Sequence, residues 1–404
     1  MDQTAFLVVV LVVALALFFD FTNGFHDTAN AMATPIATGA MKPRTAVILA
    51  AVMNLIGAFI STAVAKTISV DTINGDLTTW GPAMIFAGLT GAILWNLTTW
   101  FFGLPSSSSH ALFGGLIGAA IVYGGFDAVN VTKIVEKVLI PALFAPFIAG
   151  IAAWLATSLA YIITGRSKTN IATGRGKFKI GQIFSSSLVA LSHGTNDAQK
   201  TMGVITLVLV AAGIQSGDAG VPFWVILSAA AAIALGTFSG GWRIIKTMGH
   251  GLAEIRPAQG FAAEVSTGST ILASSYLGFA LSTTQVASGS VIGSGLGRIG
   301  AKVRWGKAGQ IVIGWFLTLP AAAAVGMLSA LLTRGLGTAG LVLDAVLAII
   351  LIVVIFQMSR KNNINHKSLA ESGVEEVGVA IASPKQVRKE AAKAKKAAKG
   401  KGKK

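Results

Sequence analysis

The chain has 404 residues, of which 53% are hydrophobic and only 12% are charged, and its mean hydropathy is +0.71. Charged residues make up about 25% of an ordinary soluble domain, so the composition excludes one and predicts an integral membrane protein. The net charge of +16 is a poor guide to partners, because the tail from Arg360 onward supplies more than half of it, and we expect no nucleic-acid partner. The absence of cysteine excludes disulfides and thiolate metal sites.

The first half of the chain, residues 1–164, contains apolar runs of about 20 residues, the length that crosses a bilayer as a helix. The first run leads into the polar motif NGFHDTANAMAT, which begins at Asn23 and contains Asp27. A second motif, GLPSSSSHALFGGLIG, begins at Gly103 and separates two apolar runs by hydroxyl residues rather than by a loop. We expect a helical hairpin that enters the membrane and turns back at this tip. Irregular backbone at membrane depth needs polar surroundings, so the tip should line a site.

A basic linker over residues 165–180 precedes a second half, residues 181–358, in which both motifs return in the same order. SHGTNDAQKTMG begins at Ser192 and contains Asp197, and GFALSTTQVASGSVIG begins at Gly278. A basic tail over residues 359–404 ends the chain, and we expect it to be disordered and cytoplasmic. The sequence thus predicts an all-α membrane protein with two repeat halves, re-entrant helical hairpins and about 10–12 membrane segments. We favour inverted topology, because paired motifs then meet near the midplane from opposite sides.

Two polar elements, repeated once in the same order inside an apolar chain, are typical of a duplicated transporter. An enzyme is not expected: a hydrolase would show G-x-S-x-G and a metalloprotease H-E-x-x-H, and neither motif is present. A passive channel stays an alternative, although it would need no paired acids for coupling. A metal transporter is disfavoured by the absence of cysteine and the scarcity of clustered histidine.

Acidic residues inside the apolar segments are candidates for function, because inserting a charge costs at least about 2.5–3.5 kcal/mol. They are Asp20, Asp27, Asp197, Glu264 and Asp344. Asp27 and Asp197 occupy equivalent repeat positions, beside His26 and Asn196 respectively and a few residues after a glycine. We expect an unwound, glycine-containing turn at each, where the carboxylate coordinates sodium or holds a transported proton. A structural ion pair or a helix cap is the alternative.

The hydroxyl clusters Ser106–Ser109 and Ser282–Thr284 complement these acids. A Ser/Thr run at the start of a helix offers hydroxyl donors together with the N–H groups of the first turn. Two such tips would bind a tetrahedral anion without a formal positive charge, whereas ordinary helix capping explains one cluster well. His110 and Gln285 follow the clusters at matching positions, where they orient the tips or donate to the ligand.

These motifs resemble the inorganic phosphate transporter (PiT) family, bacterial type, whose signature reads approximately GANDVANA in both halves. The matching residues are Gly24, Asp27, Ala29, Asn30 and Ala31 in the first copy and Gly194, Asn196 and Asp197 in the second. RPAQGFAAE, from Arg256 to Glu264, and the hydroxyl tips also resemble the family. The resemblance covers about Thr4 to Thr333, short of the last apolar segment and the tail.

The resemblance implies a secondary active transporter of the cell membrane that imports inorganic phosphate by cation symport. Phosphate would lie between the tips, and the cations near the two aspartates. The phosphate-binding candidates are Ser107, Ser108, Ser109, Ser282, Thr283, Thr284, Asn30, Gln285 and His110. The cation-coupling candidates are Asp27, Asp197, Asn196, His26 and Glu264. No cofactor or resident metal is expected besides the co-transported proton or sodium.

His26 stands where the family signature has Asn, and histidine titrates near neutrality, so we favour protons over sodium as the coupling ion. Sodium coupling stays the alternative. The sequence also leaves open whether phosphate travels alone or as a metal–phosphate complex, and whether the chain forms a homodimer.

Overall fold

The computed structural model describes residues 3–66, 77–163 and 177–361. Most of the predicted linker and of the predicted tail lies outside the described residues. The described part is all-helical, which confirms the predicted all-α class. Its β-structure is limited to an isolated bridge between Ala253 and Val303. The elements are α1 (Gln3–Ala37), α2 (Pro43–Gly57), α3 (Ala63–Lys66), α4 (Leu77–Phe101), α5 (Ser108–Gly124), η2 (Phe126–Ala128), α6 (Val131–Ile134), η3 (Val135–Leu139), α7 (Ile140–Ile163), α8 (Lys177–Ala211), α9 (Phe223–Ser239), α10 (Trp242–Gly251), α11 (Pro257–Tyr276), α12 (Thr283–Leu296) and α13 (Trp305–Lys361).

Several of the described helices are long and apolar enough to cross a membrane. Four stretches meet both conditions: Gln3–Ala37, Trp80–Phe101, Val131–Ile163 and Trp305–Arg360. A fifth is added if α9 and the first part of α10, which meet at a bend of 69°, form one span. The last stretch folds into two legs at Gly337, whose φ of 58° breaks the helix. The predicted number of 10–12 membrane segments stays a prediction.

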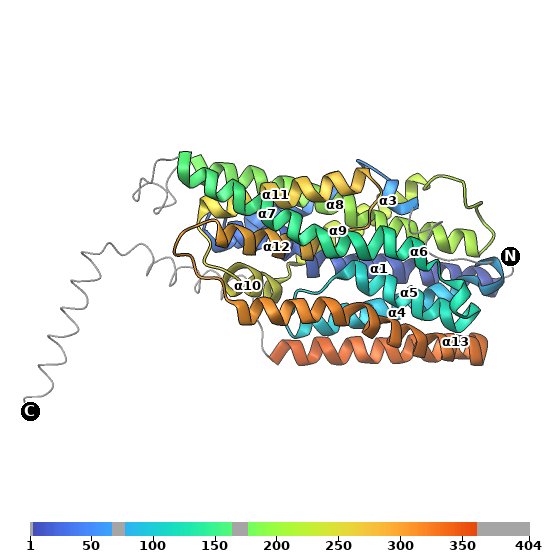
Figure 1. Ribbon diagram of the computed structural model, residues 1–404. Coiled ribbons are helices and arrows are strands. Elements are labelled where there is room, and N and C mark those ends of the chain that lie inside the picture. Colours follow the sequence, from blue (N-terminus) through green and yellow to red (C-terminus); the bar gives the residue numbers. More distant parts are fainter. Residues whose placement is uncertain (1–2, 67–76, 164–176, 362–404) are drawn as a thin grey trace, which may run out of the picture.

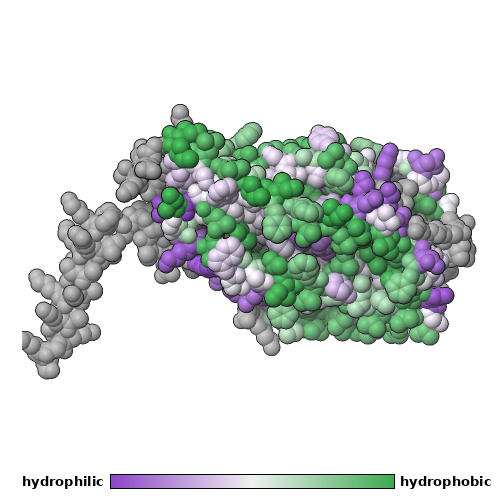
Figure 2. Space-filling model, viewed as in Figure 1, coloured by the Kyte–Doolittle hydropathy of each residue, from purple (hydrophilic) through white to green (hydrophobic). Residues whose placement is uncertain are grey.

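The helices lie side by side along one long axis (Figure 1). The end of the bundle where α13 finishes is called here the tail end, and the other end, where α1 begins, is called the opposite end. Figure 2 shows hydrophobic side chains spread over the middle of the bundle and hydrophilic ones gathered toward its ends. Exposed large apolar residues on α7 and α13, such as Phe147 and Phe316, belong to this surface. A surface of this kind suits contact with lipid rather than with water.

Glycines set how closely the central helices approach one another. Where α1 packs against α9, and where α2 packs against α8, a glycine on each helix faces a carbonyl oxygen of the other helix. A Cβ at the glycine would lie between 2.1 and 2.4 Å from that oxygen: Ile233 O for Gly24, Phe21 O for Gly236, Asn54 O for Gly194 and Leu191 O for Gly57. Only glycine allows this approach, and small residues are the usual means of close packing between membrane helices.

These glycines correct one prediction. We expected unwound turns beside Asp27 and Asp197, but α1 and α8 each run as one 35-residue helix through the aspartate. Gly24 and Gly194 do not appear among the glycines with positive φ. Because these glycines have no side chain, they allow close helix packing. The aspartates therefore project from regular helix.

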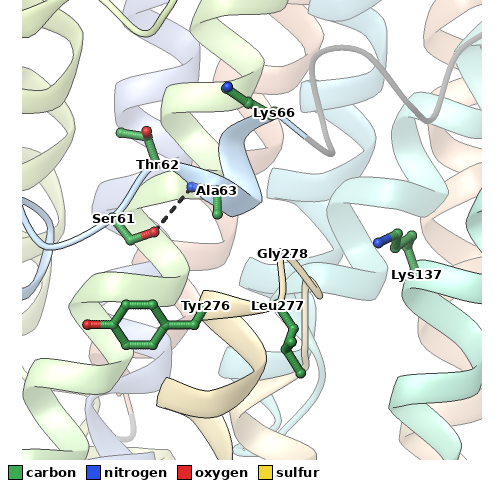
Figure 3. Close-up of a pocket in the computed structure, with 8 residues that line it drawn as sticks. All are labelled: Ser61, Thr62, Ala63, Lys66, Lys137, Tyr276, Leu277 and Gly278. Atoms are coloured by element: carbon green, nitrogen blue, oxygen red, sulfur yellow. Dashed lines mark hydrogen bonds between the residues drawn. The ribbon is translucent and has the colours of Figure 1, made fainter.

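A cavity of about 480 Å³ lies toward the opposite end, between the loop after α2, η3 and the end of α11 (Figure 3). Lys66 and Lys137 line it from different elements, and Tyr276 is its other titratable residue. Gly278, which also lines it, stands four residues before Ser282 in the second hydroxyl tip. The cavity therefore lies beside the chain segment that leads to this tip.

Candidate functional site

Asp27 of α1 and Asp197 of α8 come together in the centre of the bundle. Their side chains are 1% and 0% exposed. His193 lies between them: its Nε2 is 2.9 Å from Oδ2 of Asp197 and 3.9 Å from Oδ2 of Asp27. One ligand atom from each of these three residues lies within 4.8 Å of the others. The two equivalent acids of the sequence repeat therefore form one site rather than two.

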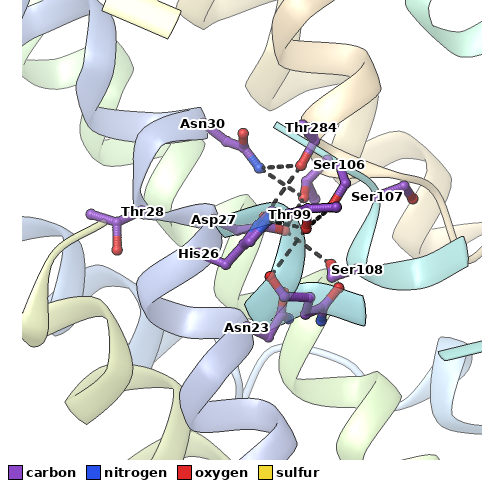
Figure 4. Close-up of polar contacts among 12 residues, drawn as sticks. Asn23, His26, Asp27, Thr28, Asn30, Thr99, Ser106, Ser107, Ser108 and Thr284 are labelled. Carbon is purple, nitrogen blue, oxygen red and sulfur yellow. Dashed lines mark hydrogen bonds and ion pairs between the residues drawn. The ribbon is translucent and has the colours of Figure 1, made fainter. Parts of the chain in front are cut away.

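The carboxylate of Asp27 is held by hydroxyls from both tips (Figure 4). Ser108 Oγ donates to Oδ2 at 3.0 Å, Thr283 Oγ1 donates to Oδ2 at 3.2 Å, and Thr284 Oγ1 donates to Oδ1 at 3.3 Å. His26 Nδ1 lies 2.6 Å from Oδ1. Both hydroxyl clusters thus converge on one carboxylate, and that carboxylate uses donors that an anionic ligand would also need.

Asp197 has a different set of partners, most of which carry N–H groups. Asn196 Nδ2 donates to Oδ1 at 2.9 Å, and Lys200 Nζ lies 2.5 Å from the same oxygen. Asn23 Nδ2 donates to Oδ2 at 3.2 Å from the neighbouring helix. This carboxylate carries a built-in positive partner, whereas the partners of Asp27 are hydroxyls and histidines.

The two tips begin helices in the interior. Ser107 is the N-cap of α5 and accepts from the His110 amide at 3.2 Å, and Ser282 is the N-cap of α12 and accepts from the Gln285 amide at 3.3 Å. Capping uses one amide of each first turn, and the remaining first-turn amides have no acceptor within their own helix. Because Ser108 and Thr283, the first residues of the two helices, contact Asp27, both helix N-termini lie beside this carboxylate.

Several polar atoms around this region have no partner among the described residues. Asn30 Nδ2 donates to Thr283 Oγ1 and Thr284 Oγ1, at 3.2 and 3.0 Å, but its Oδ1 has no partner. The same holds for His110 Nε2 and Gln285 Oε1. Buried polar groups are nearly always hydrogen-bonded. Unpartnered ones beside two helix N-termini indicate a site that holds a polar ligand or water.

Glu264 of α11 does not join the two aspartates. Its carboxylate accepts from Thr34 Oγ1 at 2.6 Å, from Gln182 Nε2 at 3.0 Å and from Ser185 Oγ at 2.5 Å. These donors belong to α1 and α8. Glu264 thus forms a second buried polar cluster along the same helices, and its predicted part in cation coupling stays a prediction.

Sequence reasoning missed some of the site. It did not include Lys200, Asn23 or His193 among the candidate site residues. Each had a signal: Lys200 stands three residues after Asp197 within an apolar helix, which puts both on one helix face. Asn23 and His193 stand four residues before the two aspartates, at equivalent repeat positions. Comparing the two copies residue by residue would have singled out all three.

Comparison with known proteins shows the family to which the chain is similar. Residues 23–326 match the phosphate transporter family. The chain is 50% identical over 374 residues to a probable low-affinity inorganic phosphate transporter of Mycobacterium leprae, covering 92% of this chain and 89% of that protein. It is 42% identical over 320 residues to a protein of the same description from Bacillus subtilis, covering 79% and 95% of the two chains. A solved structure, the sodium-dependent phosphate transporter, shares the fold with a TM-score of 0.72 at 23% identity, and the match covers 81% of this chain and 99% of that one.

Proposed function

The chain belongs to the phosphate transporter family, a family of transporters and not of enzymes, and on that premise we propose that it imports inorganic phosphate by symport with a cation. One observation carries the proposal: the Asp27 carboxylate and the hydroxyls of two helix N-termini meet in one buried site. That site has the parts for an anion and for the cation that accompanies it.

The phosphate would bind where α5 and α12 begin. Each N-terminus behaves as about half a positive charge, and its free amides suit an oxyanion. The hydroxyls of Ser108, Thr283 and Thr284 add donors in the same place, and Asn30 positions the latter two. A tetrahedral anion offers enough oxygens to accept from both tips together.

Asp27 supplies the coupling. In the structure its carboxylate accepts hydrogen bonds from the hydroxyls that we propose bind phosphate. Carboxylate and phosphate therefore compete for the same donors, and they also repel each other. A cation bound at Asp27 removes both obstacles, because it neutralises the carboxylate and releases the hydroxyls. Phosphate then favours cation binding to the same extent that the cation favours phosphate binding. This reciprocity is what symport requires.

Protons are the coupling ion that we favour. His26 and His193 both lie against the carboxylates, at 2.6 Å from Asp27 and 2.9 Å from Asp197, and an imidazole can accept and release a proton. The sodium alternative has its own support, since Asp27, His193 and Asp197 lie close enough together to hold a metal ion. We propose free phosphate as the cargo, with a metal–phosphate complex as the alternative.

We further propose that the chain is an integral membrane protein of two repeat halves with inverted topology, in which both tips are re-entrant. The opposite directions of α1 and α8 in Figure 1 support this. So does the contact of Lys179 Nζ, near the start of α8, with the carbonyl oxygen of Gly39, just beyond the end of α1, at 3.0 Å. The N-terminus and the start of α8 then face different sides of the membrane.

The tail end would face the cytoplasm. Loops and helix ends there are mainly basic. They contain the acidic residue Glu254 and the basic residues Lys42, Arg44, Lys179, Arg256, Arg298, Lys302, Arg304, Lys307 and Arg360. The opposite end carries charges of both signs: the basic residues Lys66, Lys133, Lys137 and Arg334 and the acidic residues Asp127, Glu136 and Asp218. Basic residues mark cytoplasmic loops. On this orientation α13 delivers the basic tail to the cytoplasm, and the cavity lined by two lysines lies on the outer side, where it attracts the incoming anion.

Uptake of labelled phosphate into proteoliposomes tests the proposal, with sodium and proton gradients imposed separately. We expect accumulation above the outside concentration that is driven by an inward proton gradient, persists without sodium and collapses with a protonophore. Accumulation that needs sodium at every pH would select the sodium alternative, and flux that never exceeds equilibrium would indicate a channel. A chelator of divalent cations should leave uptake unchanged if phosphate travels alone.

A further inference from the structure

We propose that Lys200 is a resident cation of the transport site: its ammonium group neutralises Asp197 throughout the cycle, so that Asp27 alone exchanges the coupling cation. The chain then moves one cation fewer per phosphate than it would with a neutral residue at position 200. This inference rests on the proposed symport and adds to it a residue that sets the cation-to-phosphate ratio.

The environment of Lys200 supports a permanent pairing. Its side chain is 0% exposed, and its Nζ lies 2.5 Å from Oδ1 of Asp197, one turn earlier on the same helix. Asp197 is itself 0% exposed. Separating two buried opposite charges is costly, because neither has water to replace its partner. Both groups also move as one body with α8, so a rearrangement of the bundle need not break the pair.

The two copies of the internal repeat differ at the position of this lysine. Lys200 stands three residues after Asp197, and the equivalent position after Asp27 is held by Asn30. Asn30 donates to the tip hydroxyls Thr283 and Thr284, and because asparagine is neutral it supplies no positive charge to Asp27. Of the two equivalent carboxylates, Asp197 has a lysine ammonium as a partner, whereas Asp27 has histidines and hydroxyls.

The partners of each carboxylate agree with this division. Asp197 accepts from Lys200, Asn196 and Asn23, which are donors that a cation bound at its oxygens would have to displace. Asp27 is instead contacted by three hydroxyls and by His26 Nδ1, and hydroxyls can turn their oxygens toward a cation and their hydrogens toward an anion. The geometry thus makes Asp27 the exchangeable position and Asp197 the occupied one.

The variant Lys200→Asn tests the inference, because it installs the residue of the first repeat. The readout is the charge moved per phosphate, obtained from the membrane voltage at which net phosphate flux into proteoliposomes reverses. We expect one more positive charge per phosphate than in the parent protein, together with a steeper dependence of uptake on the coupling cation. A ratio equal to that of the parent would overturn the inference. Lys246→Asn, at an exposed lysine of α10, is the matched control and should keep the parental ratio.

A second variant covers the case in which Lys200→Asn does not transport. Combining Lys200→Asn with Asp197→Asn removes both charges of the pair, so the double variant should recover uptake at the parental charge ratio. If the folded double variant also fails to transport, the pair does more than balance charge and the inference is wrong. The parent protein in the same vesicles tests the symport itself: absence of cation-driven uptake there would reject the proposed function, whatever the variants do.

Discussion

The substitution Asp27→Asn should separate phosphate binding from cation coupling. The Asp27 carboxylate is buried and accepts hydrogen bonds from the hydroxyls of Ser108, Thr283 and Thr284. These are the hydroxyls that we propose bind phosphate. An asparagine of nearly the same shape keeps an acceptor oxygen but removes the negative charge. Folding should not suffer, because removing a carboxylate lowers the cost of placing the helix in a membrane.

The size of the effect follows from the distance between the carboxylate and the bound anion. A phosphate that shares donors with Asp27 would sit about 5 Å from it, where two unit charges repel by about 3 kcal/mol at an effective dielectric constant near 20. Removing that repulsion should tighten cation-free phosphate binding roughly 100-fold. The same variant should lose the effect of the cation on binding, and with it uphill uptake.

Two measurements check this prediction. Calorimetric titration of the purified protein gives phosphate affinity with and without the coupling cation, and proteoliposomes give accumulation against a gradient. Asp344→Asn is the control: Asp344 is a buried carboxylate of α13 that accepts from Ser329, beyond the part of the chain that matches the family, and its replacement should keep parental coupling. If Asp27→Asn still accumulates phosphate, or still needs the cation to bind it, the cation acts elsewhere and the reasoning fails.

Three further predictions address the tips, the pH response and the packing. Ser108→Ala and Thr283→Ala should each weaken phosphate binding by about 1–3 kcal/mol, since each removes a hydrogen bond to a charged ligand; unchanged affinity in both would show that these hydroxyls do not bind phosphate. His26→Asn removes an imidazole 2.6 Å from the coupling carboxylate, so it should flatten the pH–rate profile of uptake more than it lowers the maximal rate, and a profile of parental shape would contradict proton coupling through this residue. Gly24→Ala places a Cβ 2.4 Å from a carbonyl oxygen of α9 and should destabilise the fold by about 1–3 kcal/mol, seen as a lower Tm in detergent. Gly309→Ala, where a Cβ meets nothing within 4 Å, should leave the Tm unchanged, and equal Tm values for both variants would refute the packing argument.

The sequence alone was sufficient for features that depend on local pattern. Apolar runs with few charges indicated membrane helices, and two duplicated motifs identified Asp27, Asp197 and the hydroxyl tips. The helix starts at Ser108 and Thr283 follow from the Ser/Thr runs, because a hydroxyl at the N-cap satisfies an amide of its own first turn. Such features are set by residues within one or two turns of each other, so they can be read along the chain.

The tertiary structure decided which of these groups meet. Glycine contacts bring α1 close to α9 and α2 close to α8, and α1 also packs directly against α8. The tertiary structure puts His193 between the two aspartates and keeps Glu264 with Thr34 and Ser185 instead. It also keeps α1 and α8 regular where unwound turns were expected. Contacts between residues on different helices depend on how whole helices cross, and a local sequence pattern does not specify that crossing.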